Sequence, residues 1–135
     1  MKRSCSLVLA TVASLICIAC SRRPSDPRGA LVGPYKLHIG SGWSGRGIDN
    51  STLDLQADGT SEQRDTFEDG SQFVTPGMWR LDGDNGISID KLRITTTGEI
   101  DKNASPVHAG VGVEWSHPPN IVLNPDDDCL FVKVR

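Results

Sequence analysis

The chain has 135 residues and a formal net charge of −3. From residue 31 onward there are nine Lys and Arg against sixteen Asp and Glu, a charge of −7, so the positive excess lies near the N-terminus. An acidic surface of this kind argues against a nucleic-acid partner. The roughly 105 residues of this part are enough for one hydrophobic core but not for two. We therefore expect a single folded domain.

The N-terminus has the pattern of an export signal. Lys2 and Arg3 provide a positive start, and the run from Leu7 to Ala19 is uncharged and mostly apolar. This run is too short for a membrane-spanning helix, which needs about 20 apolar residues. Arg22 then ends it abruptly. We interpret residues 1–19 as a signal peptide that is removed.

The end of this segment resembles the lipobox of bacterial lipoproteins through Ile18, Ala19 and Cys20, with Cys17 where that family usually has Leu. The resemblance implies that the thiol of Cys20 receives a lipid, which anchors the protein to a membrane. In Gram-negative members an Asp after this Cys retains the protein at the inner membrane. Ser21 stands there, which implies the outer membrane, facing the periplasm. The alternative is an ordinary secretory signal in which Cys20 is incidental.

Residues 20–33 are rich in Ser, Arg, Pro, Asp and Gly, a composition with too little apolar surface to fold alone. We expect a lipidated Cys followed by a flexible tether, and a folded domain over residues 34–135. Arg22, Arg23 and Arg28 would either contact anionic lipid or be solvated.

From residue 34 the apolar residues recur with a period of two, as where Tyr35 and Leu37 alternate with Lys36 and His38. Turn signals such as Asp58-Gly59 separate the runs, which is the pattern of successive hairpins. The predicted strands lie near 34–39, 51–57, 60–67, 71–81, 86–96, 107–115, 120–124 and 129–135. The fold class is therefore all-β, a single small antiparallel meander of about eight strands, closed as a barrel or packed as a sandwich.

Two local features interrupt this alternation. Leu92 has the opposite parity from Ile89, which predicts a bulge or tight turn near Asp90-Lys91. Gly110 and Gly112 share one face of the strand predicted near 107–115, which is typical of a bend or a close backbone approach.

The folded part also resembles small lipocalin-like bacterial lipoproteins. The resemblance rests on Gly33-x-Tyr35-x-Leu37, on the hairpin Leu53-x-Leu55-x-x-Asp58-Gly59-Thr60, and on Gly77-x-Trp79. It covers about half of the domain, and it implies a small β-barrel.

A glycine-rich loop, Gly40–Gly47, is the predicted contact surface. Its spacing matches G-x-G-x-x-G, but a strand rather than a helix follows, so we expect no dinucleotide cofactor. Trp43 and Arg46 are residue types that anchor interfaces, and we interpret them as possible partner contacts. The alternative is that Trp43 folds back over one end of the barrel.

No residue set points to catalysis or to metal binding. Ser44 lacks the following glycine of a nucleophile elbow. His38, His108 and His117 share no spacing typical of metal ligands. We therefore expect no enzyme activity, no cofactor and no metal.

The four cysteines do not form a disulfide framework. Cys5 and Cys17 would leave with the signal peptide, Cys20 would carry lipid, and Cys129 alone would remain in the fold. We expect Cys129 to be buried or to pair with another chain.

Two functions remain open. The first is a membrane-anchored envelope lipoprotein that acts as a non-enzymatic binding module for a protein, a glycan or a small apolar ligand. The second is an inhibitor or immunity protein against a secreted hydrolase, which would use the Gly40–Gly47 loop. That loop is similar to the Ser/Gly-rich loop with which lipidated lysozyme inhibitors plug a catalytic cleft.

Overall fold

The structure is a computed structural model that describes residues 22–40, 47–95, 99–125 and 129–135. One short helix precedes the strands, and the strands follow one another without further helices in the described residues. The elements are α1 (Pro27–Leu31), β1 (Gly33–His38), β2 (Ile48–Leu55), β3 (Thr60–Phe67), β4 (Gln72–Leu81), β5 (Gly86–Leu92), β6 (Val107–Glu114), β7 (Asn120–Asn124) and β8 (Cys129–Lys133).

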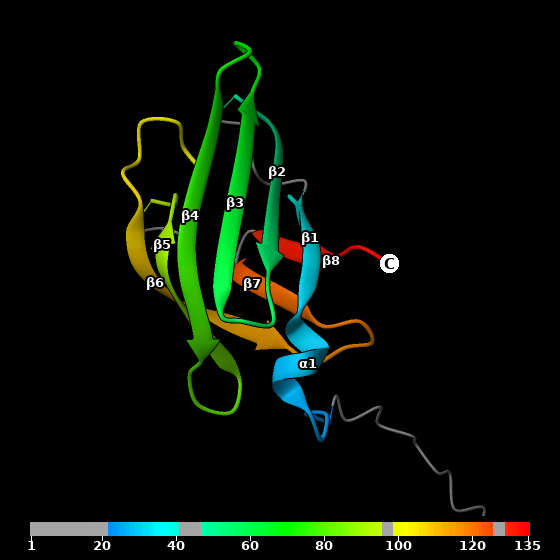
Figure 1. Ribbon diagram of the computed structural model, residues 1–135. Coiled ribbons are helices and arrows are strands. Elements are labelled where there is room, and N and C mark those ends of the chain that lie inside the picture. Colours follow the sequence, from blue (N-terminus) through cyan, green and yellow to red (C-terminus); the bar gives the residue numbers. More distant parts are fainter. Residues whose placement is uncertain (1–21, 41–46, 96–98, 126–128) are drawn as a thin grey trace, which may run out of the picture.

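The eight strands form a closed antiparallel barrel in which each strand pairs with its neighbours in the sequence and β8 pairs with β1 (Figure 1). This confirms the all-β meander and decides for the barrel over the sandwich. The Asp-Gly turns act as expected: Gly59 and Gly70 have φ angles of 91° and 82°, values that glycine adopts without strain. Asp58 and Asp69 each accept the backbone N–H two residues ahead, of Thr60 and Ser71.

Inward side chains fill the barrel. Its largest fully buried side chains include Tyr35 and Phe131. An eight-stranded barrel has an interior just wide enough for such side chains, so this arrangement is a packed core. The core residues are Leu31, Tyr35, Ile48, Leu53, Leu55, Phe67, Trp79, Ile87, Ile89, Leu92, Ile94, Ile100, Ala109, Val111, Val113, Trp115, Ile121 and Phe131.

Helix α1 covers one end of the barrel, beside the β2–β3 and β4–β5 turns (Figure 1). Leu31 is fully buried, and its carbonyl accepts a 2.7 Å hydrogen bond from the hydroxyl of Tyr35. The guanidinium of Arg28 lies 4.7 Å from the ring centroid of Trp79 and donates to the carbonyl of Ala57. The prediction of a flexible tether up to residue 33 is therefore wrong for residues 27–33, because burial of Leu31 and stacking of Arg28 order this segment.

Before α1, the tether residue Arg23 pairs with Asp84 at 3.0 Å and lies 5.9 Å from the ring centroid of Trp115. Arg23 and Arg28 therefore contact the barrel itself.

The predicted irregularity near Asp90-Lys91 is confirmed by a register shift between Ile89 and Leu92 in the pairing of β5 with β6. Strand β5 ends at Leu92 rather than near residue 96 as predicted. The reason is that the next residue, Arg93, bonds through its backbone to a side chain of β3 and leaves the strand ladder.

The structure also places Cys129 and the two glycines of β6. Cys129 is buried, 1% exposed, as one of its two predicted alternatives required. Gly110 and Gly112 face outward on β6, and a Cβ atom at Gly110 would have nothing within 4 Å, so no close approach explains this glycine. Among the described residues, no helix is long and apolar enough to cross a membrane.

Candidate functional site

The three residues predicted to carry function lie outside the described residues. Cys20 falls in the segment 1–21, and Trp43 and Arg46 fall in 41–46. The lipid anchor and the contact role of the Gly40–Gly47 loop therefore stay predictions.

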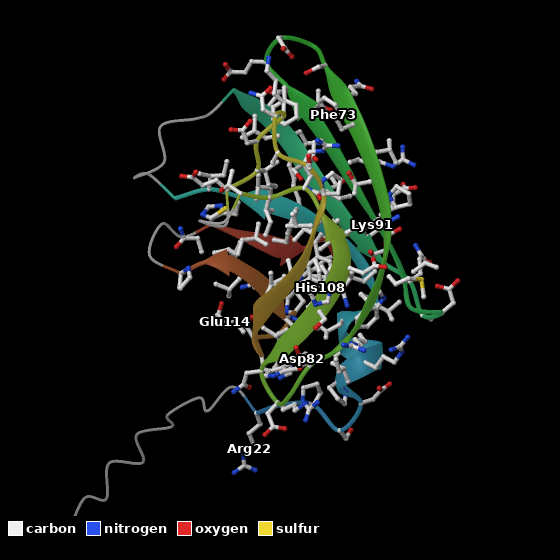
Figure 2. All side chains as sticks on the ribbon, turned by 90° about the vertical axis from the view of Figure 1, so that its left-hand side faces the viewer. Arg22, Phe73, Asp82, Lys91, His108 and Glu114 are labelled. Atoms are coloured by element: carbon white, nitrogen blue, oxygen red, sulfur yellow. The ribbon has the colours of Figure 1, made fainter. Side chains whose placement is uncertain are left out.

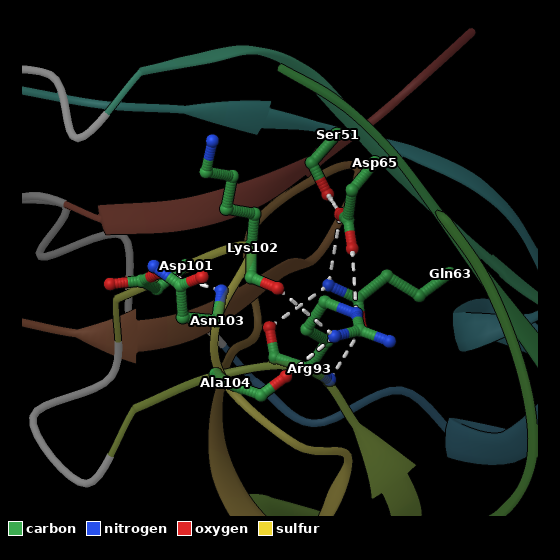
Figure 3. A network of polar contacts seen from close by, with 8 residues as sticks. All are labelled: Ser51, Gln63, Asp65, Arg93, Asp101, Lys102, Asn103 and Ala104. Atoms are coloured by element: carbon green, nitrogen blue, oxygen red, sulfur yellow. Dashed lines mark hydrogen bonds and ion pairs between the residues drawn. The ribbon is translucent and has the colours of Figure 1, made fainter. Parts of the chain in front are cut away.

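The structure instead reveals a buried polar cluster inside the barrel, formed by Ser51 of β2, Gln63 and Asp65 of β3, and Arg93 after β5 (Figure 3). Asp65 is 1% exposed. Its Oδ1 accepts a 2.6 Å hydrogen bond from the Ser51 hydroxyl and a 3.0 Å bond from the Gln63 amide. The same Gln63 carboxamide accepts from the backbone N–H of Arg93 and donates to its carbonyl, so it replaces a strand partner.

Some polar atoms of this cluster have no hydrogen-bond partner among the described residues. They are Asp65 Oδ2 and Arg93 Nε, and the buried hydroxyl of Thr75, opposite Gln63 on β4, also has none. Asp65 Oδ2 and Arg93 Nε lie 4.0 Å apart, too far for a direct hydrogen bond. Burial raises the pKa of Asp65 above its ordinary value, against the opposing effects of its hydrogen bonds and of Arg93. Burial therefore makes the charged form of this carboxyl group less favourable than it is for an exposed aspartate.

Arg93 also attaches the β5–β6 connection to the barrel. Its guanidinium donates to the carbonyls of Ala104, at 2.5 Å, and Lys102, at 3.5 Å. Lys102 in turn pairs at 2.6 Å with Asp69 in the β3–β4 turn. Ile100 of the same connection is fully buried in the core. The connection is thus held across the end of the barrel opposite α1.

A catalytic role for this cluster has no support in its geometry. A buried carboxyl group with a raised pKa beside a hydroxyl is a pattern seen at active sites. However, the side chain of Asp65 is 0% exposed, and the hydroxyl of Ser51 is committed to it. A substrate cannot reach either group in this arrangement. The cluster organises the interior and the β5–β6 connection.

The outer wall carries a groove of about 380 Å³ over β4, β5 and β6. Its lining residues are Met78, Trp79, Arg80, Ser88, Asp90 and His108. The absence of a side chain at Gly110, which pairs with Ser88, leaves space beside this groove. In Figure 2 this face of the barrel is turned toward the viewer, with His108 and Lys91 on it.

A metal site is not formed by the described part of the chain, where no group of three or more His, Cys, Asp and Glu residues could hold an ion. His108 lines the outer groove, whereas His38 lines a separate groove with Val132 and Lys133.

Comparison with protein-family models, with curated proteins and with solved structures finds no match to this chain.

Sequence reasoning missed both the polar cluster and the groove. The available signal for the cluster was the occurrence of Ser61, Gln63 and Asp65 at alternate positions between two apolar-patterned strands, which places polar residues on one face of β3. That pattern does not reveal which face is buried, and Arg93 is 30 residues away from its partner Gln63.

Proposed function

We propose that this protein is a membrane-anchored lipoprotein of the cell envelope, attached to the outer membrane and facing the periplasm, and that it acts there as a non-enzymatic module that binds another protein. The observation that carries the binding part is the division of the barrel into a filled interior and a grooved outer wall. Side chains as large as Tyr35 and Phe131 occupy the space where a lipocalin-type barrel would hold a small apolar ligand. Recognition through the outer surface favours a macromolecular partner.

The anchoring part rests on the lipobox-like residues that end at Cys20. If a lipid on its thiol holds the protein, Cys20→Ser should move the full chain from the membrane fraction to the soluble fraction and abolish incorporation of radiolabelled palmitate. Cys5→Ser, in the same signal segment, is the matched control and should remain at the membrane. Membrane retention and labelling of Cys20→Ser would contradict the anchor.

The binding part is tested by chemical cross-linking of the anchored full chain in intact cells. A discrete cross-linked species of defined mass, identified by mass spectrometry as one envelope protein, is expected. Failure to cross-link any protein would contradict a protein-binding role. Replacement of Trp43 and Arg46 by Ala separates the two candidate functions, because capture of a hydrolase that depends on these residues would favour the inhibitor.

A further inference from the structure

Strand β4 has an unpaired edge. Its residues Gln72 to Met78 all pair with β3 on one side. On the other side, pairing with β5 covers only the stretch from Trp79 to Leu81. The half of β4 nearest the β3–β4 turn is therefore an edge within an otherwise closed barrel.

The direction of the backbone groups on this edge follows from two hydrogen bonds. The Trp79 N–H donates at 2.7 Å to the carbonyl of Gly59, on the β3 side. The Met78 N–H points the other way and donates at 2.6 Å to Asp90 Oδ1. Because these directions alternate along a strand, the N–H and C=O groups of Val74 also point away from β3. The same holds for Gln72 and for the carbonyl of Pro76, which has no N–H.

The chain that would have paired with this edge passes beneath it. The carbonyl of Lys91 lies 3.1 Å from the position of a Cβ atom at Gly77, which is on the inward face of β4. Two residues later the Gln63 carboxamide, inside the barrel, holds the backbone of Arg93. In the described residues no backbone hydrogen bond reaches Val74 from this side, and this residue is 54% exposed.

These unpaired groups define the chemistry of an occupant. We name the backbone edge of Gln72, Val74 and Pro76 the β4 edge. Donors and acceptors repeated at the spacing of a strand match another extended polypeptide backbone, which is how peptides add to sheets. Pro76 contributes an acceptor alone and closes the edge before Asp90, so a short segment fits.

Two exposed cations beyond the Pro76 end of the β4 edge favour an acidic occupant. Arg80 and Lys91 are exposed and form no ion pair among the described residues, and His108 lines the adjoining groove. The carboxylates nearby are already engaged: Asp90 accepts from the Met78 N–H, Asp82 accepts from the Ser88 hydroxyl, and Glu62 pairs with Arg64. Arg80 and Lys91, which have no ion-pair partner among the described residues, are the cations here that would attract carboxylates of a partner.

We propose that the β4 edge binds a short, extended, acidic segment of a partner protein as an added strand, with the carboxylates of that segment near Arg80 and Lys91. The proposal rests on the proposed function in taking the partner to be a protein, and it states how that protein is held.

The test uses the full chain in detergent micelles and synthetic seven-residue peptides of alternating Val and Glu as probes, with binding measured by fluorescence anisotropy. N-methylation of one alternate set of peptide residues should weaken binding by roughly tenfold or more, because it removes the N–H groups that face β4. Methylation of the other set should leave binding nearly unchanged. A peptide of alternating Val and Lys should bind more weakly.

Two protein variants provide the complementary arm. Val74→Pro removes the donor at the centre of the β4 edge and should abolish binding, whereas Val74→Ala keeps the donor and should retain it. If Val74→Pro does not fold, the methylated peptides still test whether the partner segment binds as an added strand. Equal effects of both methylation patterns would overturn strand addition, as would undetectable peptide binding. The protein alone could also form a dimer that dissociates in Val74→Pro. That result would assign the β4 edge to a second copy of the chain and overturn the proposal of an acidic partner. None of these outcomes depends on the cross-linking result, so the two proposals fail separately.

Discussion

Asp65 shows how one side chain can make the stability of this protein depend on pH. Burial raises its folded-state pKa above the value near 4 that is typical of an unfolded chain. Folding therefore favours the protonated carboxyl group. Its contribution to the free energy of unfolding is complete below about pH 4 and is lost as pH rises through the folded-state pKa.

Replacement of this residue by a neutral analogue tests that account. Asp65→Asn keeps an oxygen that can accept from Ser51 and Gln63, but it cannot ionise. We expect the free energy of unfolding of the native protein, from urea titrations at a series of pH values, to fall above about pH 4, and the profile of the variant to be flatter. An unchanged slope in Asp65→Asn would assign the pH dependence to other groups.

Asp69 contributes with the opposite sign. A hydrogen bond from Lys102, with further bonds from Ser71, holds the pKa of Asp69 well below its ordinary value. Its contribution to the free energy of unfolding is present above about pH 4 and is lost as pH falls. The pH range over which this contribution changes therefore lies below the range for Asp65.

At the scale of elements, α1 is part of the folded domain although its sequence resembles a linker. Asp26 accepts the N–H of Gly29 as an N-cap, and Pro27 begins the helix, but five residues are far too few to be helical alone. The contact of Leu31 with the core, the bond from Tyr35 and the bond from Lys133 to Ala30 supply the missing stability.

Truncation of the buried side chain measures this contribution. Leu31→Ala should lower the free energy of unfolding by about 2–5 kcal/mol, the range for fully buried leucines. Arg22→Ala, at an exposed position before the helix, is the control and should change it by less than about 0.5 kcal/mol. Equal stability of the two variants in urea unfolding would mean that residues 27–31 do not pack on the barrel.

The predictability of the elements differs along the chain. Strand β7 was predicted with its observed bounds, because alternation and turn residues are local signals. The predicted end of strand β5 is four residues too late. The residues after Leu92 still alternate between polar and apolar, but in the structure the Gln63 side chain, and not a neighbouring strand, pairs with the backbone of Arg93. Helix α1 was missed because its stability comes from residues far away in the sequence.

For the whole molecule, closure depends on the last strand. Strand β8 pairs with both β1 and β7, so the barrel has no edge at this position. The fully buried Phe131 lies on it. Loss of β8 would expose two edges and a part of the core, a combination that promotes aggregation.

Deletion of residues 129–135 should therefore give a protein that is largely insoluble or elutes as aggregates in size-exclusion chromatography. Deletion of Arg135 alone, beyond the last backbone bond from Val134 to Pro34, is the control and should elute as the native protein does. Native elution of the longer truncation would mean that β8 does not close the barrel.

The sequence by itself determined the all-β class, the order of the eight strands and the bulge near Asp90, because alternation and Asp-Gly turns act over a few neighbouring residues. The tertiary structure alone decided the closure by β8, the docking of α1, the meeting of Asp65 with Arg93 and the unpaired edge at Val74. Each of these depends on which distant strands become neighbours and in which register, and local periodicity contains no information about either.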